Sequence, residues 1–154
     1  MDVEERLARL EAIEAIKVLK ARYCRFCDAD YDADGVATLL ADPFWFDGGP
    51  GFGRHVGRAA FKAFWDSIRG DIRFAAHLVL NPIIEIVDAQ NARGKWRLLM
   101  PCTVASGGAT EARWLLCDYD ETYVCVDGQW LFGSIAMKVN FYASHLTGWA
   151  SSGV

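Results

Sequence analysis

Two side chains of this chain could together move a proton, Asp28 and His77. Asp28 stands where an amphipathic helix is predicted to end, and His77 lies in the apolar run of residues 74–80. A carboxylate near a helix C-terminus is disfavoured by the helix dipole, so it needs a partner that donates hydrogen bonds or carries positive charge. A histidine oriented by a carboxylate is a suitable general base. Alone, each residue also fits a structural role, as a turn cap or a core imidazole.

A C-x-x-C motif and a glycine-rich stretch are weaker candidates for functional sites. The motif Cys24-Arg25-Phe26-Cys27 falls near the end of a helix, where the dipole does not stabilise a thiolate, so thiol redox chemistry is disfavoured. No second cysteine pair or histidine cluster supplies metal ligands. The glycine-rich stretch at residues 48–53 lacks a following Lys-Ser/Thr and indicates a turn rather than a phosphate loop. We expect free thiols, no metal and no cofactor.

The elements that must position Asp28 and His77 follow from the hydrophobic periodicity. A three-to-four-residue period predicts helices over residues 3–27, 33–41 and 58–68. Residues 44–47 form a short predicted strand. Alternation then predicts four strands over 74–87, 93–105, 112–126 and 129–142, separated by turn residues such as Asp127-Gly128. The order predicts an α+β fold in which a curved antiparallel sheet wraps around N-terminal helices. We expect one domain over residues 1–154, with the tail after about residue 142 unassigned.

The strand alternation also predicts which residues face the helices. The inward set is soft and apolar, and fits either ordinary core or a cavity for an apolar, ring-shaped molecule. The candidate substrate-binding residues are Trp45, Trp65, Trp96, Leu98, Met100, Leu115, Tyr119, Ile135 and Met137.

Composition limits the partners and the location. The chain has 154 residues, a net charge of −4 and 53% hydrophobic residues. The acidic balance disfavours nucleic acid and anionic membranes, which both require a basic patch. No apolar run reaches the roughly 18 residues of a membrane span. Residues 1–5 are acidic rather than basic and then apolar, so a signal peptide is not indicated and we expect a cytoplasmic protein.

Three motifs together resemble one superfamily. They are I-x-x-I-K-x-L-K-A-R-Y-C-R-x-x-D over residues 13–28, Gly57-Arg58 before the third helix, and the strand 119–124 leading to Asp-Gly-x-Trp. The chain resembles the polyketide-cyclase-like branch of the nuclear transport factor 2-like superfamily, which implies a cystatin-like, cone-shaped fold. Within it, the chain looks most like scytalone dehydratase, bile acid 7α-dehydratase and hexachlorocyclohexane dehydrochlorinase. These enzymes eliminate water or HCl without a cofactor.

The resemblance implies specific roles. The eliminating enzymes pair an aspartate at the end of the first helix with a histidine on the first long strand, matching Asp28 and His77, and Tyr23 matches a tyrosine of the bile acid enzyme. An arginine that several of them carry on the last strand falls at Ile135 here, which favours loss of water, or migration of a double bond in a hydrophobic substrate, over loss of chloride.

The function that follows is a cofactor-independent, dehydratase-like lyase acting on an apolar cyclic molecule. The alternatives are a ketosteroid-isomerase-like proton shuttle and a non-catalytic ligand-binding or scaffold domain. Apolar residues on the outer sheet face (Leu99, Leu116, Val124) predict a homo-oligomer, either a trimer or a dimer.

Overall fold

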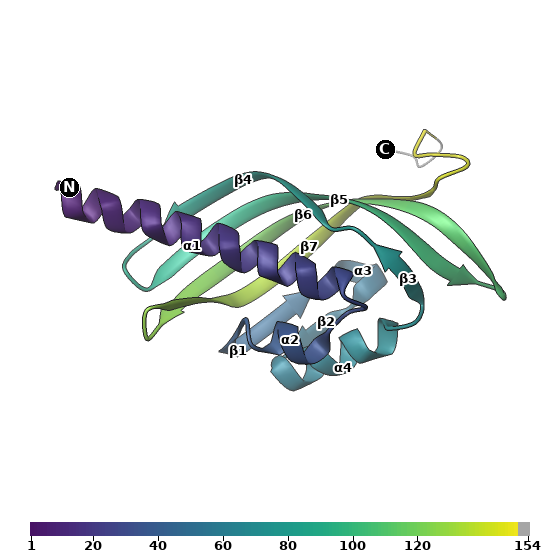
Figure 1. Cartoon of the computed structure of the whole chain (residues 1–154), viewed down its shortest axis with the longest axis horizontal. Coiled ribbons are helices and arrows are strands. Elements are labelled where there is room, and N and C mark those ends of the chain that lie inside the picture. Colours follow the sequence, from purple (N-terminus) through teal and green to yellow (C-terminus); the bar gives the residue numbers. More distant parts are fainter. Residues whose placement is uncertain (151–154) are drawn as a thin grey trace.

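A long helix and a strongly curved sheet dominate the computed structural model, which describes residues 1–150 (Figure 1). Helix α1 (Val3–Asp28) begins with a capping box, in which Asp2 accepts from the Glu5 backbone N–H at 2.8 Å and Glu5 accepts from the Asp2 N–H at 3.0 Å. The second half of α1 buries residues on one face, among them Ile16, Leu19 and Tyr23. This half therefore carries the packing of the helix on the sheet.

The sheet is mixed and open. Its strands are β1 (Leu40–Asp47), β2 (Arg54–Val56), β3 (Ile72–Ala75), β4 (Leu78–Ile86), β5 (Asn91–Ser106), β6 (Ala109–Val126) and β7 (Gln129–Ser144). Their order is β2-β1-β7-β6-β5-β3, and β4 also pairs with β5. The strands β5, β6 and β7 form the predicted antiparallel meander, whereas β1 joins β7 in parallel. The cystatin-like fold is thus confirmed, with one parallel pair.

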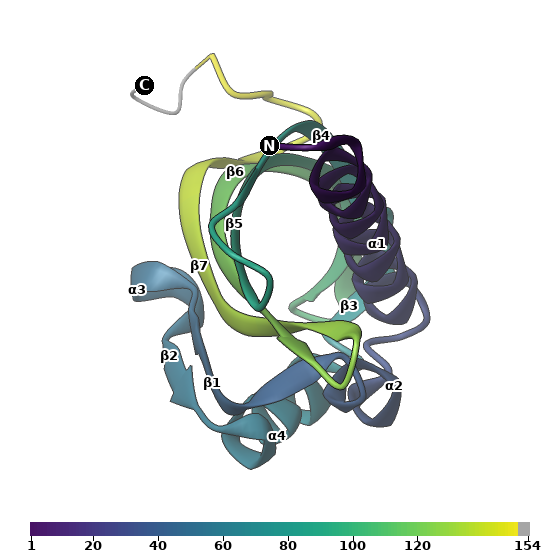
Figure 2. The same cartoon turned by 90° about the vertical axis from the view of Figure 1, so that its left-hand side faces the viewer.

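The end-on view in Figure 2 shows how the sheet makes a cone. Strands β5, β6 and β7 curve around the centre, and α1 crosses the open side of the curve. The short helix α2 (Ala33–Ala37), the helical turn α3 (Gly49–Phe52) and helix α4 (Arg58–Ile68) lie with β1 and β2 on one side of the curved strands, in the lower part of Figure 2. Helix α4 buries Phe61 and Trp65. These two aromatic side chains pack against each other and cover that side of the cone.

The helix predicted over residues 33–41 is wrong in its second half. Helix α2 ends at Ala37, and strand β1 already begins at Leu40. The Phe132 backbone N–H donates to the Leu39 carbonyl at 2.9 Å, and Leu40 pairs with Phe132. Pairing with β7 therefore overrides the local helical pattern, as tertiary contacts often do for short segments.

The strand predicted over residues 74–87 is divided in two. Strand β3 ends at Ala75 and β4 begins at Leu78, so His77 lies in the break. The Asp28 carboxylate accepts the His77 backbone N–H at 3.0 and 3.2 Å. This contact removes the N–H from the sheet ladder, which explains why the strand is interrupted at this residue.

The predicted turns and faces agree well with the structure. Asp127 and Gly128 adopt positive φ values of 50° and 77°, as a two-residue hairpin turn requires. The predicted inward residues of β5 and β6 are buried, and the outward residues Leu99, Leu116 and Val124 are half-buried. Within residues 1–150, no helix is long and apolar enough to cross a membrane. Of the unassigned tail, residues 151–154 lie outside the described part.

Candidate active site

Asp28 and His77 come together although 49 residues separate them. His77 Nδ1 lies 2.7 Å from Asp28 Oδ1, and the His77 backbone N–H donates to the same carboxylate. The His77 side chain is 6% exposed and the Asp28 side chain 36%. The two donors from His77 supply the partner that a carboxylate at a helix C-terminus needs.

The contact with Asp28 fixes which nitrogen of His77 can act as a base. A carboxylate only accepts hydrogen bonds, so Nδ1 carries the hydrogen and donates it to Asp28. Nε2 is then the unprotonated nitrogen of the neutral ring, and His77 belongs to the wall of a cavity. An imidazole held in this tautomer can accept a proton at Nε2, and the carboxylate then stabilises the imidazolium.

A tight turn after α1 brings a tyrosine against the imidazole. Asp30 and Tyr31 have positive φ values of 55° and 52°. Such a conformation is unusual for a bulky residue and costs free energy, which is tolerated mainly at functional sites. The conformation places the Tyr31 ring edge-on to His77, with centroids 6.2 Å apart, and edge-on to Trp65 at 5.4 Å. Tyr31 is thus part of the site.

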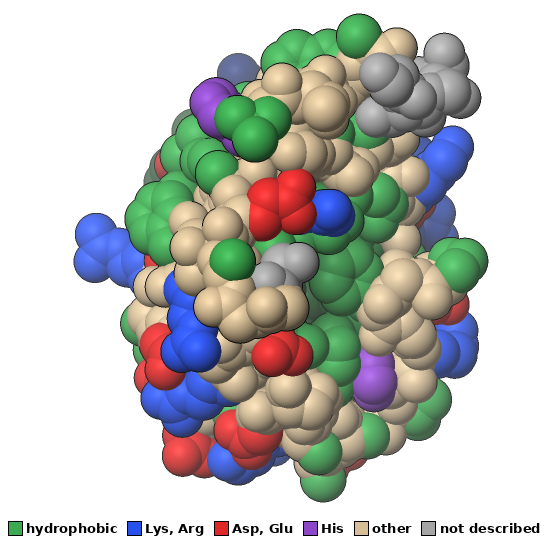
Figure 3. Space-filling model, turned by 90° about the vertical axis from the view of Figure 1, so that its right-hand side faces the viewer, with side chains coloured by type: hydrophobic (Ala, Val, Ile, Leu, Met, Phe, Trp, Pro, Cys, Tyr) green, Lys and Arg blue, Asp and Glu red, His purple; other side chains and the backbone are tan. Residues whose placement is uncertain are grey.

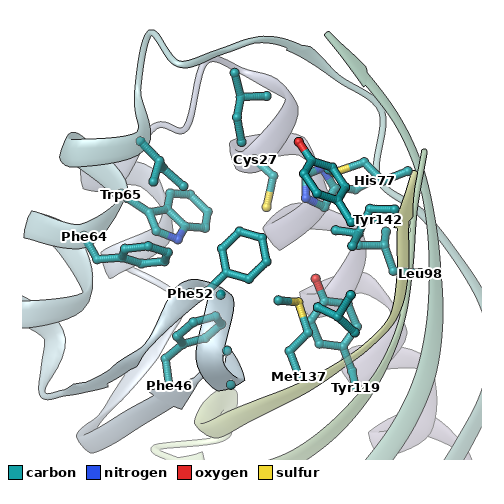
Figure 4. A pocket seen from close by; sticks show the side chains of 18 of the residues that line it. Cys27, Phe46, Phe52, Phe64, Trp65, His77, Leu98, Tyr119, Met137 and Tyr142 are labelled. Carbon is teal, nitrogen blue, oxygen red and sulfur yellow. The ribbon is translucent and has the colours of Figure 1, made fainter. Parts of the chain in front are cut away.

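A cavity of about 630 Å³ opens beside His77. Figure 3 shows the recess on the face viewed from the right of Figure 1, with hydrophobic side chains gathered in it. In Figure 4 the labelled aromatic side chains and Met137 surround the space, and Phe52 projects into its middle from α3. The volume lies within the range of pockets that hold small-molecule ligands.

Most of the predicted site residues line this cavity. Those that do are Tyr23, His77, Trp65, Leu98, Met100, Leu115, Tyr119 and Met137. Asp28 contacts the cavity only through His77.

Three predicted lining residues lie elsewhere. Trp45 is half-buried beneath the Arg54 guanidinium, which lies 4.8 Å from its ring, and its neighbour Phe46 lines the cavity instead. Successive residues of a strand point to opposite faces, so the two could not both line it. Trp96 and Ile135 are buried, as predicted, but neither borders this cavity. Strand alternation correctly predicted that both side chains point inward. It does not predict how deep into the cone the cavity extends.

The cavity tyrosines remain hydrogen-bond donors at neutral pH. Burial raises the pKa of Tyr23 and Tyr119 well above its usual value, with Cys27, Glu121 and other nearby groups adding to the effect. Burial also raises the pKa of Tyr31. Desolvation disfavours the phenolate, so each hydroxyl keeps its proton and can donate it to a ligand oxygen.

A buried ion pair lies below the cavity and was missed by the sequence analysis. Lys20 Nζ contacts Glu121 Oε1 at 2.5 Å, and neither side chain is exposed. The Tyr123 hydroxyl donates to Glu121, and Trp96 Nε1 donates to the Tyr123 hydroxyl at 2.8 Å. The alternation of β6 places Glu121 on the inward face, but Lys20 is one of several cations of an amphipathic helix, and its burial does not follow from the sequence pattern.

Cysteine chemistry and metal binding find no support in the described residues. All five cysteines are free thiols there, and no group of three or more His, Cys, Asp or Glu side chains could hold a metal. Burial raises the pKa of Cys24 to about 11 and that of Cys27 well above its usual value. Both thiols of the C-x-x-C motif are therefore protonated and unreactive near neutral pH.

A cystatin-like cone with an Asp–His pair at an apolar cavity defines the class of protein. A comparison with protein families agrees with this class. The chain matches the SnoaL-like domain over residues 8–135. It therefore belongs to the SnoaL-like family, within the nuclear transport factor 2-like fold. A comparison with curated proteins gave no significant match.

Solved structures show the same fold. A scytalone dehydratase candidate from Novosphingobium aromaticivorans superposes with a TM-score of 0.80, at 22% identity and 90% coverage of both chains. The hexachlorocyclohexane dehydrochlorinase LinA-type3 from Novosphingobium barchaimii superposes with a TM-score of 0.80, at 19% identity, covering 90% of this chain and 93% of that one. An NTF2-like protein with a cystatin-like fold from N. aromaticivorans gives 0.66 at 20% identity and 90% coverage of both chains.

Proposed function

We propose that this chain is a cofactor-independent lyase that eliminates water from an apolar cyclic molecule. The observation that carries the proposal is the Asp28–His77 pair, with Nδ1 and Oδ1 2.7 Å apart, at the wall of an apolar cavity of about 630 Å³. The similar structures include proteins named as a dehydratase candidate and a dehydrochlorinase, which supports the reaction class.

His77 is the general base of the proposed reaction. Its Nε2 takes a proton from a carbon next to a carbonyl group, and Asp28 stabilises the imidazolium that forms. Expulsion of the hydroxyl group then breaks the carbon–oxygen bond, and the imidazolium returns the proton so that water leaves. A positioned general base contributes roughly 10²–10⁴-fold in rate, so substrate orientation and hydrogen bonding must supply the rest.

Tyr23 completes the proposed catalytic set. It lines the cavity and lies five residues before Asp28 on α1. Its hydroxyl donates to the carbonyl or to the leaving oxygen. Within the described residues, no arginine lines the cavity, and the exposed Lys138 is the one lysine that reaches it. Because Lys138 is exposed to solvent, the described wall has no buried cation, which suits the loss of water, which leaves uncharged, better than the loss of chloride.

The isomerase alternative is less well supported by the site. A ketosteroid-isomerase-like shuttle needs an acidic donor facing the substrate, and the one inward carboxylate of the long strands, Glu121, is buried against Lys20 outside the cavity lining. A non-catalytic ligand-binding domain would have the cavity but no requirement for the Asp28–His77 contact.

The test of the reaction is a product screen by NMR. The protein is incubated with neutral ring compounds that carry a hydroxyl β to a carbonyl, from single phenolic rings to steroid-sized systems. We expect an unsaturated product from at least one compound, and a loss of at least 100-fold in His77→Ala. His145→Gln is the matched control, since His145 lies outside the cavity and contacts Trp114. Full activity in His77→Ala would refute the assignment of the base.

We also propose that the protein is cytoplasmic and forms a dimer or trimer. Exposed apolar side chains, among them Leu78, Leu80 and Ile83, lie on β4, next to the half-buried apolar residues of β5 and β6. Sedimentation of the purified protein tests the assembly. A single species at the chain mass of 17.1 kDa would contradict it.

A further inference from the structure

The buried ion pair between Lys20 and Glu121 has no part in the proposed elimination. Its lysine nevertheless lies against Tyr23 and Tyr119, which line the cavity. Lys20 on α1 and Glu121 on β6 are both fully buried. Burying two charges costs free energy that their attraction does not always recover, and an apolar pair at such positions is often as stable. A gain in stability is thus a weak explanation for the presence of the ion pair. The residues around Lys20 and Glu121 indicate a role in the site instead.

Glu121 is held by a chain of donors on one side. Its Oε2 accepts from the Tyr123 hydroxyl, which in turn accepts from Trp96 Nε1 at 2.8 Å. Its Oε1 accepts from Lys20. Neither Trp96 nor Tyr123 lines the cavity. The negative charge is therefore neutralised and fixed in the filled part of the cone.

The positive charge of Lys20 lies against the cavity tyrosines. Lys20 Nζ is 3.6 Å from the centroid of the Tyr119 ring and 4.6 Å from that of Tyr23. Both tyrosines line the cavity. A desolvated ammonium over an aromatic face is a strong cation–π contact. It withdraws electron density from the ring, which makes the phenol a stronger hydrogen-bond donor.

The Tyr119 hydroxyl is in reach of a ligand that also contacts His77. Figure 4 shows the Tyr119 oxygen directed into the cavity, at the end of its ring that is nearer to His77. Tyr119 and His77 line the same cavity, so one ligand can contact both side chains. Buried side-chain oxygens without a partner are absent from the described residues. No side-chain hydrogen bond joins the Tyr119 hydroxyl to another described residue, so this oxygen borders the cavity instead of being sealed in the core.

We propose that Tyr119 donates the hydrogen bond that stabilises the substrate oxyanion, and that Lys20, fixed by Glu121, is the positioning residue that strengthens it. This inference rests on the proposed elimination. When His77 takes the proton from carbon, the electron pair moves to the carbonyl oxygen, which becomes an enolate. Tyr119 keeps its proton and donates it as a hydrogen bond. The enolate then collapses, the carbon–oxygen bond to the hydroxyl breaks, and His77 returns the proton. Donors placed where charge develops supply large rate effects in sites that exclude water.

A stable oxyanion tests the donor without any substrate. The probe is 2-naphthol, whose ionised and neutral forms absorb differently, and naphthalene is the matched ligand with the same rings and no oxygen. We expect the wild-type protein to bind the ionised form preferentially. Tyr119→Phe should weaken naphtholate binding by about 10–100-fold, the loss expected for a hydrogen bond to a charged group. The double variant Lys20→Met/Glu121→Leu, which keeps the hydroxyl, should weaken it by about 5-fold or more.

Naphthalene affinity separates an electrostatic role from a structural one. It should stay within twofold of wild type in both variants if the cavity is intact. Failure of the wild type to bind naphtholate, or unchanged naphtholate binding in Tyr119→Phe, would overturn the assignment of Tyr119. Unchanged binding in the double variant alone would overturn the role of Lys20. Naphtholate binding that follows these expectations while no elimination is found would mean that the reaction is wrong but the oxyanion site is real.

Discussion

At the scale of single residues, a carboxylate and an imidazole acquire a function only through each other. Asp28 at the C-terminal end of α1 accepts both the backbone N–H and the ring N–H of His77. The pairing was predicted from the resemblance to the eliminating enzymes, because each residue alone also fits a structural role. Tyr31 was not predictable, because its place depends on a left-handed backbone that its sequence does not favour.

The role of Asp28 predicts a specific effect of substitution. Asp28→Asn can still accept the His77 backbone N–H, so the free energy of unfolding should change by only about 1 kcal/mol. The amide does not stabilise an imidazolium, so turnover should fall by at least about 100-fold. Asp30→Asn is the matched control, since Asp30 contacts Arg69 at 2.9 Å and not His77. Steady-state kinetics and urea unfolding measure the two effects. A large loss of stability with unchanged turnover would make Asp28 a structural residue.

At the scale of elements, strand alternation was sufficient for the faces of β5 and β6 but not for the depth of the cavity. Periodicity placed Trp96 and Leu98 on one face, and both are buried, yet only Leu98 lines the cavity. The ion pair between α1 and β6 joins residues that are 101 positions apart. A contact of this kind depends on how the helix lies on the sheet, which periodicity does not give.

The ion pair predicts non-additive stability effects. Lys20→Met leaves Glu121 charged and without its cation, which should cost about 3–5 kcal/mol of unfolding free energy. The double variant Lys20→Met/Glu121→Leu removes both charges and should recover most of that loss. Denaturant unfolding of the three proteins gives the coupling directly. Additive losses in the double variant would mean that the two side chains do not stabilise each other.

The segment that carries Phe52 predicts a pair of glycine variants. A Cβ on Gly48 would lie 2.3 Å from Phe52 Cβ and 2.8 Å from Phe46 Cε1, whereas a Cβ on Gly51 meets nothing within 4 Å. Gly48→Ala should therefore displace Phe52, lower the melting temperature by several degrees and change naphthalene affinity. Gly51→Ala should leave the melting temperature within error. Equal effects of the two variants would show that Phe52 does not shape the cavity.

At the scale of the whole molecule, the sheet curls around a core that is only partly filled. The α+β class and the meander were predictable, because long amphipathic segments and hairpin turns are strong local signals, and the family was predicted from its motifs. The division of residues 74–87 and the parallel pairing of β1 with β7 were not, because both are set by contacts distant in sequence.

The buried thiols and phenols predict a loss of stability in alkali. The pKa of Cys24 is raised by burial from 9.0 to about 11, and that of Cys117 to about 12. Above pH 9 the unfolded chain releases these protons before the folded one, so unfolding becomes more favourable by about 1.4 kcal/mol per pH unit for each group. The stabilisation is complete below pH 9 and is lost as the pH rises through the folded values. Urea midpoints at pH 8 and 10.5 measure it, and Cys117→Ala should flatten the decline.

The central claim, abstraction of a proton from carbon by His77, is tested most directly by hydrogen exchange in a compound that cannot eliminate. An apolar ring ketone without a leaving group is incubated with the protein in D₂O, and deuterium at the carbon next to the carbonyl is followed by NMR. We predict incorporation with the wild-type protein, a reduction of at least about 100-fold in His77→Ala, and no reduction in His145→Gln. Exchange that is equally fast in His77→Ala would contradict the account.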